Sequence, residues 1–143
     1  WKDQFLAQIE GQYDASRVHF TGTLPYEQFL PLLQLSACHV YLTYPFVMSW
    51  SLLEAMACGC AVVGSNTAPV REVIRHGSNG LLVDFFSPAD LASAVAELLR
   101  DRERAEAFGV EARRTVVRSY DRDVCVQRQL ALMDLVASGS INA

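Results

Sequence analysis

The sequence predicts an α/β fold, namely a doubly wound, mostly parallel sheet flanked by helices. Short apolar runs recur at 38–43, 60–64 and 81–83, and stretches with helical spacing separate them. Strands that are apolar along their whole length are typical of parallel sheets, because helices cover both faces of such sheets. Strands that alternate with helices favour a doubly wound architecture.

Size and composition agree with a single globular domain over residues 1–143. Of the 143 residues, 51% are hydrophobic and 20% are charged, which excludes intrinsic disorder. The net charge of −4 argues against non-specific binding to nucleic acid. No apolar run reaches the roughly 18 residues that suggest a membrane-spanning helix. We therefore expect one core and no nucleic-acid partner.

The first third of the chain is expected to hold two strands and a helix between them. The run 17–21 is bounded by polar residues and a glycine, so it is interpreted as the first strand. Residues 26–36 look helical, and Pro31 is expected to divide this helix into two short pieces. The β-prone run 38–43 is the expected second strand.

The next helix has clear signals at both of its ends. Ser49 or Ser51 can cap its N-terminus, because a serine hydroxyl accepts a hydrogen bond from a free helix N–H. The helix is expected to run through Ala57 and to end at Gly59. The apolar run 60–64 then follows as the third strand.

The second half of the chain is expected to be mainly helical. A helix is expected over 69–75, followed by the fourth strand at 81–83. Ser87, with a proline directly after it, is a good start for another helix. The stretches 101–118 and 121–136 complete the expected helices, and the charges of the first of them are interpreted as a solvated face.

The two ends of the sequence carry expectations of their own. The chain starts at Trp1 without an initiator Met or a signal-peptide pattern, and we expect its first residues to lie inside a helix. We therefore expect a piece excised from a longer protein. Residues 137–143 are expected to be a loose tail.

Three loops are expected at the carboxyl ends of strands, where open parallel sheets bind their ligands. They are residues 22–25, 44–51 and 65–69. The middle loop leads into a helix whose free N–H groups and dipole favour an anion, and Ser49 and Ser51 add hydroxyls. The alternative is an ordinary capped helix without a ligand, since every βα unit has such a terminus.

Two carboxylates and two histidines are the other candidate site residues. Glu54 lies in an apolar stretch, and as an acceptor it suits vicinal ribose hydroxyls; the alternative is a solvent-facing or salt-bridged glutamate. Glu72 can contact a ligand or the backbone at the start of its own helix. His19 and His39 lie in expected strands, where packing is a commoner role than catalysis.

Several kinds of chemistry lack their motifs. There is no G-x-G-x-x-G, no P-loop, no arguable Ser-His-Asp order and no close carboxylate pair. Cys58 and Cys60 form a C-x-C pair without a second pair of zinc ligands, so we expect no metal. Free cysteines in apolar stretches suit a reducing compartment, so we expect the protein to be cytoplasmic.

From residue 17 to about residue 120 the chain resembles the C-terminal half of the family 4 (group 1) glycosyltransferases. The stretches that carry this resemblance are Phe20-Thr21-Gly22-Thr23-Leu24, residues 51–63, Arg71-Glu72-Val73-Ile74 and Asn79-Gly80-Leu81-Leu82-Val83. Each stretch alone is weak, but their combination in this order is specific. The helix 91–99 and the charged helix after it are also similar to that family.

The resemblance implies the Rossmann-like, donor-binding half of a two-domain GT-B enzyme. Such an enzyme retains the anomeric configuration while it transfers a hexosyl group from a nucleotide-diphosphate sugar to an acceptor hydroxyl. It needs no metal or other cofactor. The acceptor, which can be a glycan, a lipid or a small molecule, is bound mainly by the other domain. Peripheral membrane association of the full-length protein is compatible with such acceptors.

The same resemblance assigns roles to residues of this sequence. Glu54 matches the second glutamate of the family's E-x7-E motif and would bind the ribose hydroxyls. The first glutamate of that motif falls on Phe46, which cannot accept hydrogen bonds. The other donor-binding residues would be Met48, Ser49, Trp50 and Ser51 at the diphosphate and sugar, and Gly22, Thr23 and Leu24 near the base.

No catalytic residue is assigned within this sequence, and the piece alone is expected to be inactive. Two alternatives stay open. One is half of a GT-B sugar-nucleotide epimerase. The other is a binding or interaction module without catalysis, for which Phe46 is the supporting feature.

Overall fold

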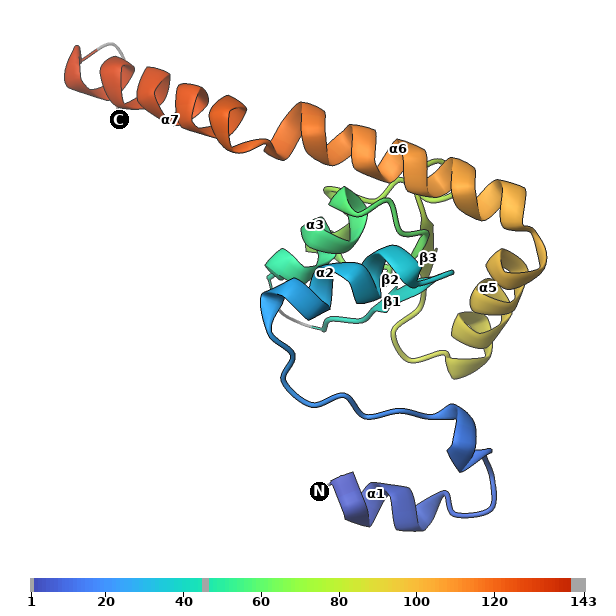
Figure 1. Cartoon of the computed structure of the whole chain (residues 1–143). Coiled ribbons are helices and arrows are strands. Elements are labelled where there is room, and N and C mark those ends of the chain that lie inside the picture. The colour runs from blue at the N-terminus through green and yellow to red at the C-terminus, as the bar shows by residue number, and fades with distance from the viewer. Residues whose placement is uncertain (1, 45–46, 140–143) are drawn as a thin grey trace.

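The computed structural model of the chain describes residues 2–44 and 47–139. Helices and short strands alternate along it (Figure 1). The elements in chain order are α1 (Lys2–Gln8), η1 (Ala15–Arg17), α2 (Tyr26–Leu35), β1 (His39–Tyr41), α3 (Trp50–Ala57), β2 (Val62–Ser65), α4 (Ala68–Arg71), β3 (Leu81–Val83), α5 (Pro88–Arg100), α6 (Arg102–Tyr120) and α7 (Arg122–Ala137).

The three described strands form one parallel sheet in the order β1-β2-β3. His39 lies opposite Val62, and Val63 lies opposite Leu81. Each connection between neighbouring strands includes a helix, as parallel pairing requires. The predicted α/β class with a parallel sheet is therefore confirmed.

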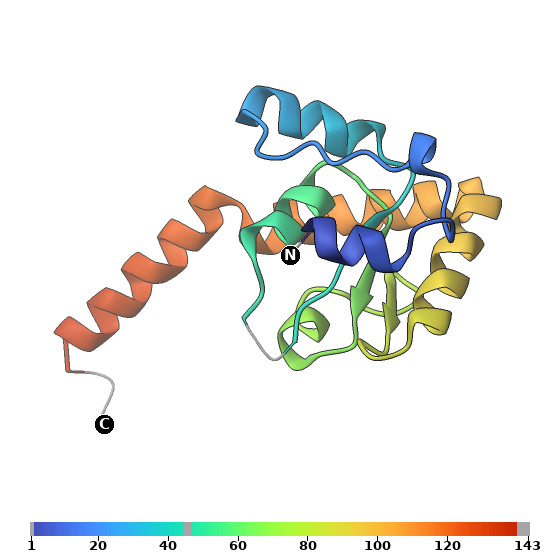
Figure 2. The same cartoon turned by 90° about the horizontal axis from the view of Figure 1, so that it is seen from below.

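Helices cover both faces of this sheet, and two apolar clusters result (Figure 2). Neighbouring residues of β2 point to opposite faces, so Val62 belongs to one cluster and Val63 to the other. The first cluster is built around Leu33, Leu52, Met56, Val70, Val73 and Ile74, and the second around Leu81, Ala94, Leu98 and Phe108. The sheet is thus wound on both sides, as the sequence predicts.

Helix α6 contributes to both clusters and packs closely on the end of α3. Ala105 and Phe108 enter one cluster, and Ala112 enters the other. A Cβ atom on Gly109 would lie 2.1 Å from the carbonyl oxygen of Gly59, so a side chain there would collide with backbone. The close approach of these two backbones therefore depends on glycine.

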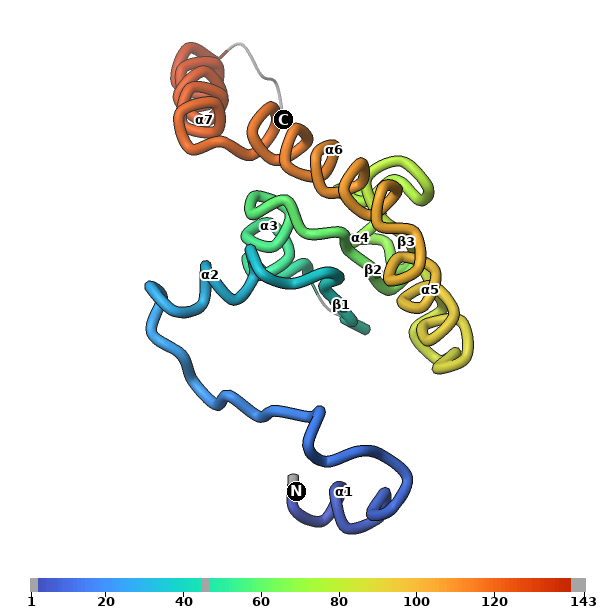
Figure 3. The backbone as a smooth tube through the Cα atoms, turned by 45° about the vertical axis from the view of Figure 1, so that its right-hand side comes forward, coloured from blue at the N-terminus to red at the C-terminus, as the bar shows by residue number. Residues whose placement is uncertain are grey.

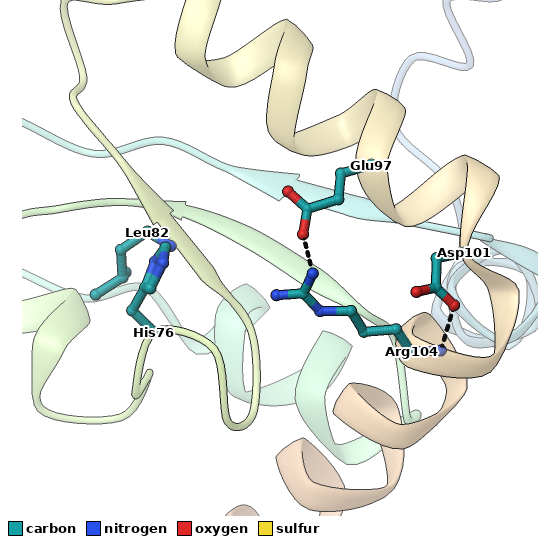
Figure 4. A network of polar contacts seen from close by, with 5 residues as sticks. All are labelled: His76, Leu82, Glu97, Asp101 and Arg104. Carbon is teal, nitrogen blue, oxygen red and sulfur yellow. Dashed lines mark hydrogen bonds and ion pairs between the residues drawn. The ribbon is translucent and has the colours of Figure 1, made fainter.

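Side chains fix the ends of several helices, as capping signals in the sequence predict. The hydroxyl of Ser87 accepts a hydrogen bond from the amide of Asp90, and the carboxylate of Asp101 accepts one from the amide of Arg104. Arg104 also forms an ion pair with Glu97 across the corner between α5 and α6 (Figure 4). The corner is thereby closed by local contacts.

The prediction of a first strand at 17–21 is wrong. Asp14 caps a short 3-10 helix instead, and its carboxylate accepts hydrogen bonds from the amide and hydroxyl of Ser16. Residues 18–25 follow as an irregular connection, and the side chains of Val18 and Phe20 are exposed. An extended apolar segment becomes a strand only where a neighbour pairs with it and a surface covers it.

Three further expectations need correction in detail. Pro31 does not divide α2, which is a single helix from Tyr26 to Leu35 with Pro31 at an exposed position. Helix α4 ends at Arg71 and does not reach residue 75. The Asn79 side chain accepts a hydrogen bond from the Arg75 amide at 2.7 Å and donates one to the Val73 carbonyl at 2.9 Å, so it replaces helical bonds. Of the tail expected at 137–143, Ala137 closes α7, and residues 140–143 lie outside the described residues.

The first and last helices lie at the margins of the molecule. An extended connection separates α1 from the sheet, and α7 continues beyond the body from the end of α6 (Figure 3). No residue of α7 is fully buried. Within residues 2–44 and 47–139, no helix combines the length and apolar character that crossing a bilayer requires.

Candidate functional site

The loops that follow β1 and β2 are joined at the carboxyl edge of the sheet by Ser65. This last residue of β2 is fully buried. Its hydroxyl accepts a hydrogen bond from the amide of Thr43 at 3.0 Å and donates one to the Thr43 carbonyl at 2.9 Å. The two loops therefore start from fixed positions, side by side, where open α/β sheets bind ligands.

The loop after β1 ends at the capped N-terminus of α3. The hydroxyl oxygen of Ser49 accepts hydrogen bonds from the amide of Ser51 at 3.3 Å and from the hydroxyl of Ser51 at 3.1 Å. The amide of Ser49 donates to the hydroxyl of Tyr41 at 2.7 Å. Because Tyr41 is buried at the end of β1, the start of α3 is anchored to the sheet.

This terminus can hold an anion. The first N–H groups of a helix lack partners within the helix, and the dipole places partial positive charge there. The Ser49 hydroxyl already accepts two bonds, so its own proton is free for a ligand, whereas the Ser51 proton is used by Ser49. Trp50 is 83% exposed beside this point, and Met48 packs partly against the core.

Glu54 lies one turn into α3, on the side away from the buried Leu52 and Ala55. Its side chain is half-buried, and within the described part of the chain it forms no hydrogen bond or ion pair. The salt-bridged alternative is thus not observed there. The pKa of the nearby Cys58 thiol is raised, mainly by burial. The Glu54 carboxylate also raises this pKa, whereas the Arg113 guanidinium lowers it.

The structure brings together only some of the residues that the sequence singles out. Residues 48–51 and Glu54 lie at one helix start. Residues 22–24 belong to the irregular stretch before α2, and no described hydrogen bond joins them to α3. Phe46 lies outside the described residues.

A hollow of about 570 Å³ lies beside this helix start, between the loops that follow β1 and β2. It is lined by Tyr44, Val47, Asn66, Thr67, Ala68, Pro69, Arg71 and Glu72. The Oγ1 atom of Thr67 is shielded from solvent and has no hydrogen-bond partner in the described structure. Glu72 does not bond to the start of its own helix, so its structural alternative is not observed.

An aromatic cluster holds one wall of this hollow in place. The ring of Tyr44 stacks on Phe85, with 5.4 Å between the ring centroids, and meets Phe86 edge-on at 5.0 Å. Tyr44 and Phe86 are nevertheless more than half exposed. The cluster joins the loop after β1 to the turn after β3.

A second hollow, of about 440 Å³, lies at the opposite end of the sheet. The ends of α2, α5 and α6 line it, with Leu35, Leu98 and Arg102 among its residues. Parallel sheets bind ligands at the carboxyl ends of their strands, so the hollow beside α3 is the better candidate.

The histidines and cysteines have mainly structural surroundings. His39 is half-buried in β1, and burial lowers its pKa. His19 is exposed in the irregular stretch, whereas Nδ1 of His76 accepts a hydrogen bond from the Leu82 amide at 3.0 Å (Figure 4). Burial raises the pKa of Cys60 to about 11. Residues 2–44 and 47–139 hold no group of three metal-binding side chains, and the expectation of no metal stays a prediction.

Tyr41, Tyr44 and Thr67 are site residues that the sequence reasoning missed. Tyr44 and Thr67 lie just after the carboxyl ends of expected strands, which is the signal that could have found them, whereas Tyr41 lies inside the strand expected at 38–43. The loop 65–69 was recognised as a strand-end loop, but spacing alone cannot show that Thr67 and Tyr44 line one hollow.

Known proteins resemble the chain in sequence. A family model described as glycosyl transferases group 1 matches residues 1–115. An uncharacterised glycosyltransferase of Methanocaldococcus jannaschii is 26% identical over 81% of this chain and 30% of that protein. The GDP-mannose-dependent alpha-(1-6)-phosphatidylinositol monomannoside mannosyltransferase of Mycobacterium tuberculosis is 42% identical over 50% of this chain and 18% of that protein. The chain thus spans less than a third of the length of these two curated relatives.

The fold also has known counterparts. The structure of HepE from Anabaena, solved in complex with UDP-glucose, matches 96% of this chain and 37% of that chain with a TM-score of 0.81. The sequence identity is 22%, so the likeness concerns the fold. That fold is the GT-B glycosyltransferase fold that the sequence predicts.

Proposed function

The chain belongs to the group 1 glycosyl transferases, and from this premise we propose that it is the donor-binding part of a retaining glycosyltransferase. The full-length enzyme would transfer a hexosyl group from a nucleotide-diphosphate sugar to an acceptor hydroxyl. The acceptor would be held mainly by the rest of that protein. The proposal includes no metal and no other resident cofactor.

The start of α3 is the observation that carries this proposal. Tyr41 anchors the Ser49 amide, and the free N–H groups of the first turn can face a diphosphate. Such groups stabilise the negative charge that develops on a leaving nucleoside diphosphate. The dipole alone supplies about 0.3–1 kcal/mol in an exposed site, so cationic groups from outside this chain would have to add to it.

Glu54 gives the site its preference for a nucleotide over a simple anion. Its carboxylate lies one turn beyond the helix start and has no described partner, so it can accept bonds from two vicinal ribose hydroxyls. Residues 22–24 would approach the base when donor and partner domain are in place. The names of two similar proteins, which mention GDP-mannose and UDP-glucose, support this donor class.

Two finer points belong to the same proposal. The free cysteines suit a reducing compartment, so we place this chemistry in the cytoplasm. This chain by itself would be catalytically inert, because the acceptor site and the added cations lie elsewhere. Turnover of a nucleotide sugar by these 143 residues would contradict that statement.

A second candidate function is a nucleotide-sugar-binding module without catalysis. Phe46 favours it, because phenylalanine replaces the first glutamate of the motif that the sequence resembles. Phe46→Glu in the full-length protein distinguishes the two functions. If the protein is a non-catalytic module, the substitution would create transferase activity. If the protein is a glycosyltransferase, the substitution would lower its activity.

Titration of the chain with UDP, GDP and ADP tests the donor site. We expect one nucleotide to shift the backbone amide resonances of residues 49–54. Glu54→Gln should raise the Kd of that nucleotide about tenfold, because an ionised hydrogen-bond acceptor is lost. Glu103→Gln, an exposed carboxylate at the start of α6, is the matched control and should change nothing. Absence of any response, in this chain and in the full-length protein, would refute the donor site.

A further inference from the structure

Helix α3 is short and is held at both of its ends. It has eight residues, and isolated helices of that length are unstable in water. At its start, the amide of Ser49 donates to the hydroxyl of the buried Tyr41. At its other end, the guanidinium of Arg113 in α6 donates to the carbonyl of Ala57. Contacts from outside the helix therefore set the position of both ends.

Arg113 supplies a partner that the last turn of α3 needs. The final carbonyls of a helix have no partner within the helix. Those of Glu54, Ala55 and Met56 accept from backbone amides that follow the helix, at 2.9–3.0 Å. The carbonyl of Ala57, the last residue of α3, accepts from the side chain of Arg113. A cation at this end also complements the negative end of the helix dipole.

The carboxylate of Glu54 belongs to the same turn. Residues three and four apart are neighbours on a helix, so Glu54 lies beside Ala57 and Cys58. The charges of Arg113 and Glu54 both act on the Cys58 thiol, whose pKa the first lowers and the second raises. The guanidinium and the carboxylate therefore both lie close to the last turn of α3.

These two charges are near one another without being joined. No ion pair links Arg113 to Glu54 among residues 2–44 and 47–139, and the guanidinium is engaged by the Ala57 carbonyl. The Glu54 oxygens therefore keep their capacity to accept hydrogen bonds from a ligand. Attraction at longer range limits where the carboxylate can move. A cation held in this way steadies the acceptor without occupying it.

We propose that Arg113 is a positioning residue for the contact between Glu54 and a ribose. The inference rests on the proposed function, in which Glu54 accepts hydrogen bonds from the ribose hydroxyls. Arg113 acts through α3: it holds the last turn, and so keeps the carboxylate where both hydroxyls can reach it. Loss of the guanidinium would loosen this turn and leave the helix start in place, because Tyr41 holds Ser49 independently.

The test compares a nucleoside diphosphate with its dideoxy form, which lacks both ribose hydroxyls. The nucleotide is the one among UDP, GDP and ADP that binds this chain with the lowest Kd. In the wild type, the dideoxy form should bind about tenfold more weakly, because hydrogen bonds to an ionised acceptor are lost. Base and diphosphate are common to both ligands, so the ratio of the two Kd values measures the ribose contact alone.

Two substitutions of Arg113 and one matched control sharpen the test. Arg113→Met should reduce the ratio from about tenfold to about threefold, while the Kd of the dideoxy form stays unchanged. Arg113→Lys should restore most of the ratio, because a positive charge remains at the end of α3. Arg114→Met removes the same charge from the next position, where the arginine pairs with Glu111 of its own helix, and should leave the ratio at about tenfold.

Titration of the Cys58 thiol adds a measurement that needs no nucleotide. The Arg113 guanidinium lowers the pKa of this thiol, so Arg113→Met should raise it, and Arg114→Met should leave it unchanged. The Cβ resonance of Cys58 follows the titration, and thermal unfolding checks that each variant is folded. An unchanged pKa in Arg113→Met would show that Arg113 does not hold the end of α3, and would overturn the inference.

Each outcome of the binding test decides. If Arg113→Met keeps a tenfold ratio, or if Arg113→Lys recovers none of it, Arg113 is not a positioning residue and the proposed function stands. Equal weakening of both ligands also overturns the inference, because it would mean a general loss of α3. If the wild-type ratio is near one, the inference fails together with the ribose contact, whereas an anion site at residues 49–51 stands. If no nucleotide binds to this chain or to the full-length protein, both the inference and the proposed function fail.

Discussion

Helices α6 and α7 follow one another in the chain, have similar lengths and begin with the same kind of cap, yet only α6 belongs to the core. Five of its residues are buried, whereas no residue of α7 is. The large apolar side chains of α7, including Leu130, Leu132 and Met133, are about half exposed. Burial, not length or capping, therefore separates the two helices.

The difference has a functional side. Helix α6 packs against the end of α3, and the Arg113 guanidinium donates to the carbonyl of Ala57 there. The other end of α3 is the proposed donor site. A destabilising substitution in α6 should therefore disturb the site through α3, whereas one in α7 should leave the site unchanged.

Truncation of one large side chain in each helix tests this contrast most directly. Phe108→Ala should lower the free energy of unfolding by about 4 kcal/mol, because Phe108 is 5% exposed and a cavity would remain. Leu132→Ala in α7 should change it by no more than about 0.5 kcal/mol, since Leu132 is 54% exposed. Urea unfolding measures both, and similar losses in the two variants would refute the contrast.

Gly109→Ala decides between helix propensity and steric collision. Alanine in an exposed helix interior is favoured over glycine by about 1 kcal/mol. At this position the new Cβ would lie 2.1 Å from a backbone oxygen, and overpacking of this kind costs about 1–3 kcal/mol or more. We expect a lower melting temperature, with Val110→Ala on the exposed side as control. A more stable Gly109→Ala protein would show that α6 does not approach α3 so closely.

The cysteines Cys60 and Cys125 sharpen the comparison chemically. Cys125 is exposed on α7, so iodoacetamide should alkylate it in the folded protein, whereas Cys60 should react only on unfolding. Burial raises the pKa of Cys60 from 9.0 to about 11. Its neutral thiol therefore contributes stability that is complete below pH 9 and is lost as the pH rises towards 11.

A Cys60→Ala variant isolates this pH effect. The wild-type free energy of unfolding should fall more steeply between pH 9 and pH 11 than that of the variant. Parallel slopes, or rapid alkylation of both thiols in the folded protein, would contradict the burial of Cys60.

The caps of the two helices should show the smallest effect. Asp101 and Asp121 each accept a hydrogen bond from a first-turn amide. Asp101→Ala should lower global stability by about 1 kcal/mol, because α6 folds with the core. Asp121→Ala should leave global unfolding unchanged and increase amide hydrogen exchange within α7 alone. Equal global losses would mean that α7 unfolds together with the core.

Local signals predicted much of the fold. Ser49 and Ser87 marked helix starts correctly, because a cap is a contact between residues a few positions apart. The strand expected at 17–21 failed for the opposite reason. Val18 and Phe20 have suitable propensity, but pairing and cover come from distant residues, and they stay exposed here.

The same distinction between local and distant contacts applies to the candidate site. The start of α3 and Glu54 could be predicted, since both depend on a strand followed by a helix. The hollow could not, because it needs the loop after β1 and the residues after β2 to meet in space. The shortening of α4 also escaped prediction, because Asn79 competes for its backbone groups from beyond the helix.

The serine at the end of β2 has a consequence for motion. Through its two bonds to Thr43, the hydroxyl of Ser65 continues the pairing of the strands by one step after their backbone ladder has stopped. These two bonds tie Thr43 directly to the end of β2. A ligand that orders the residues around Thr43 would therefore also order the residues around Thr67. The two loops would respond together even to a molecule that contacts only one of them.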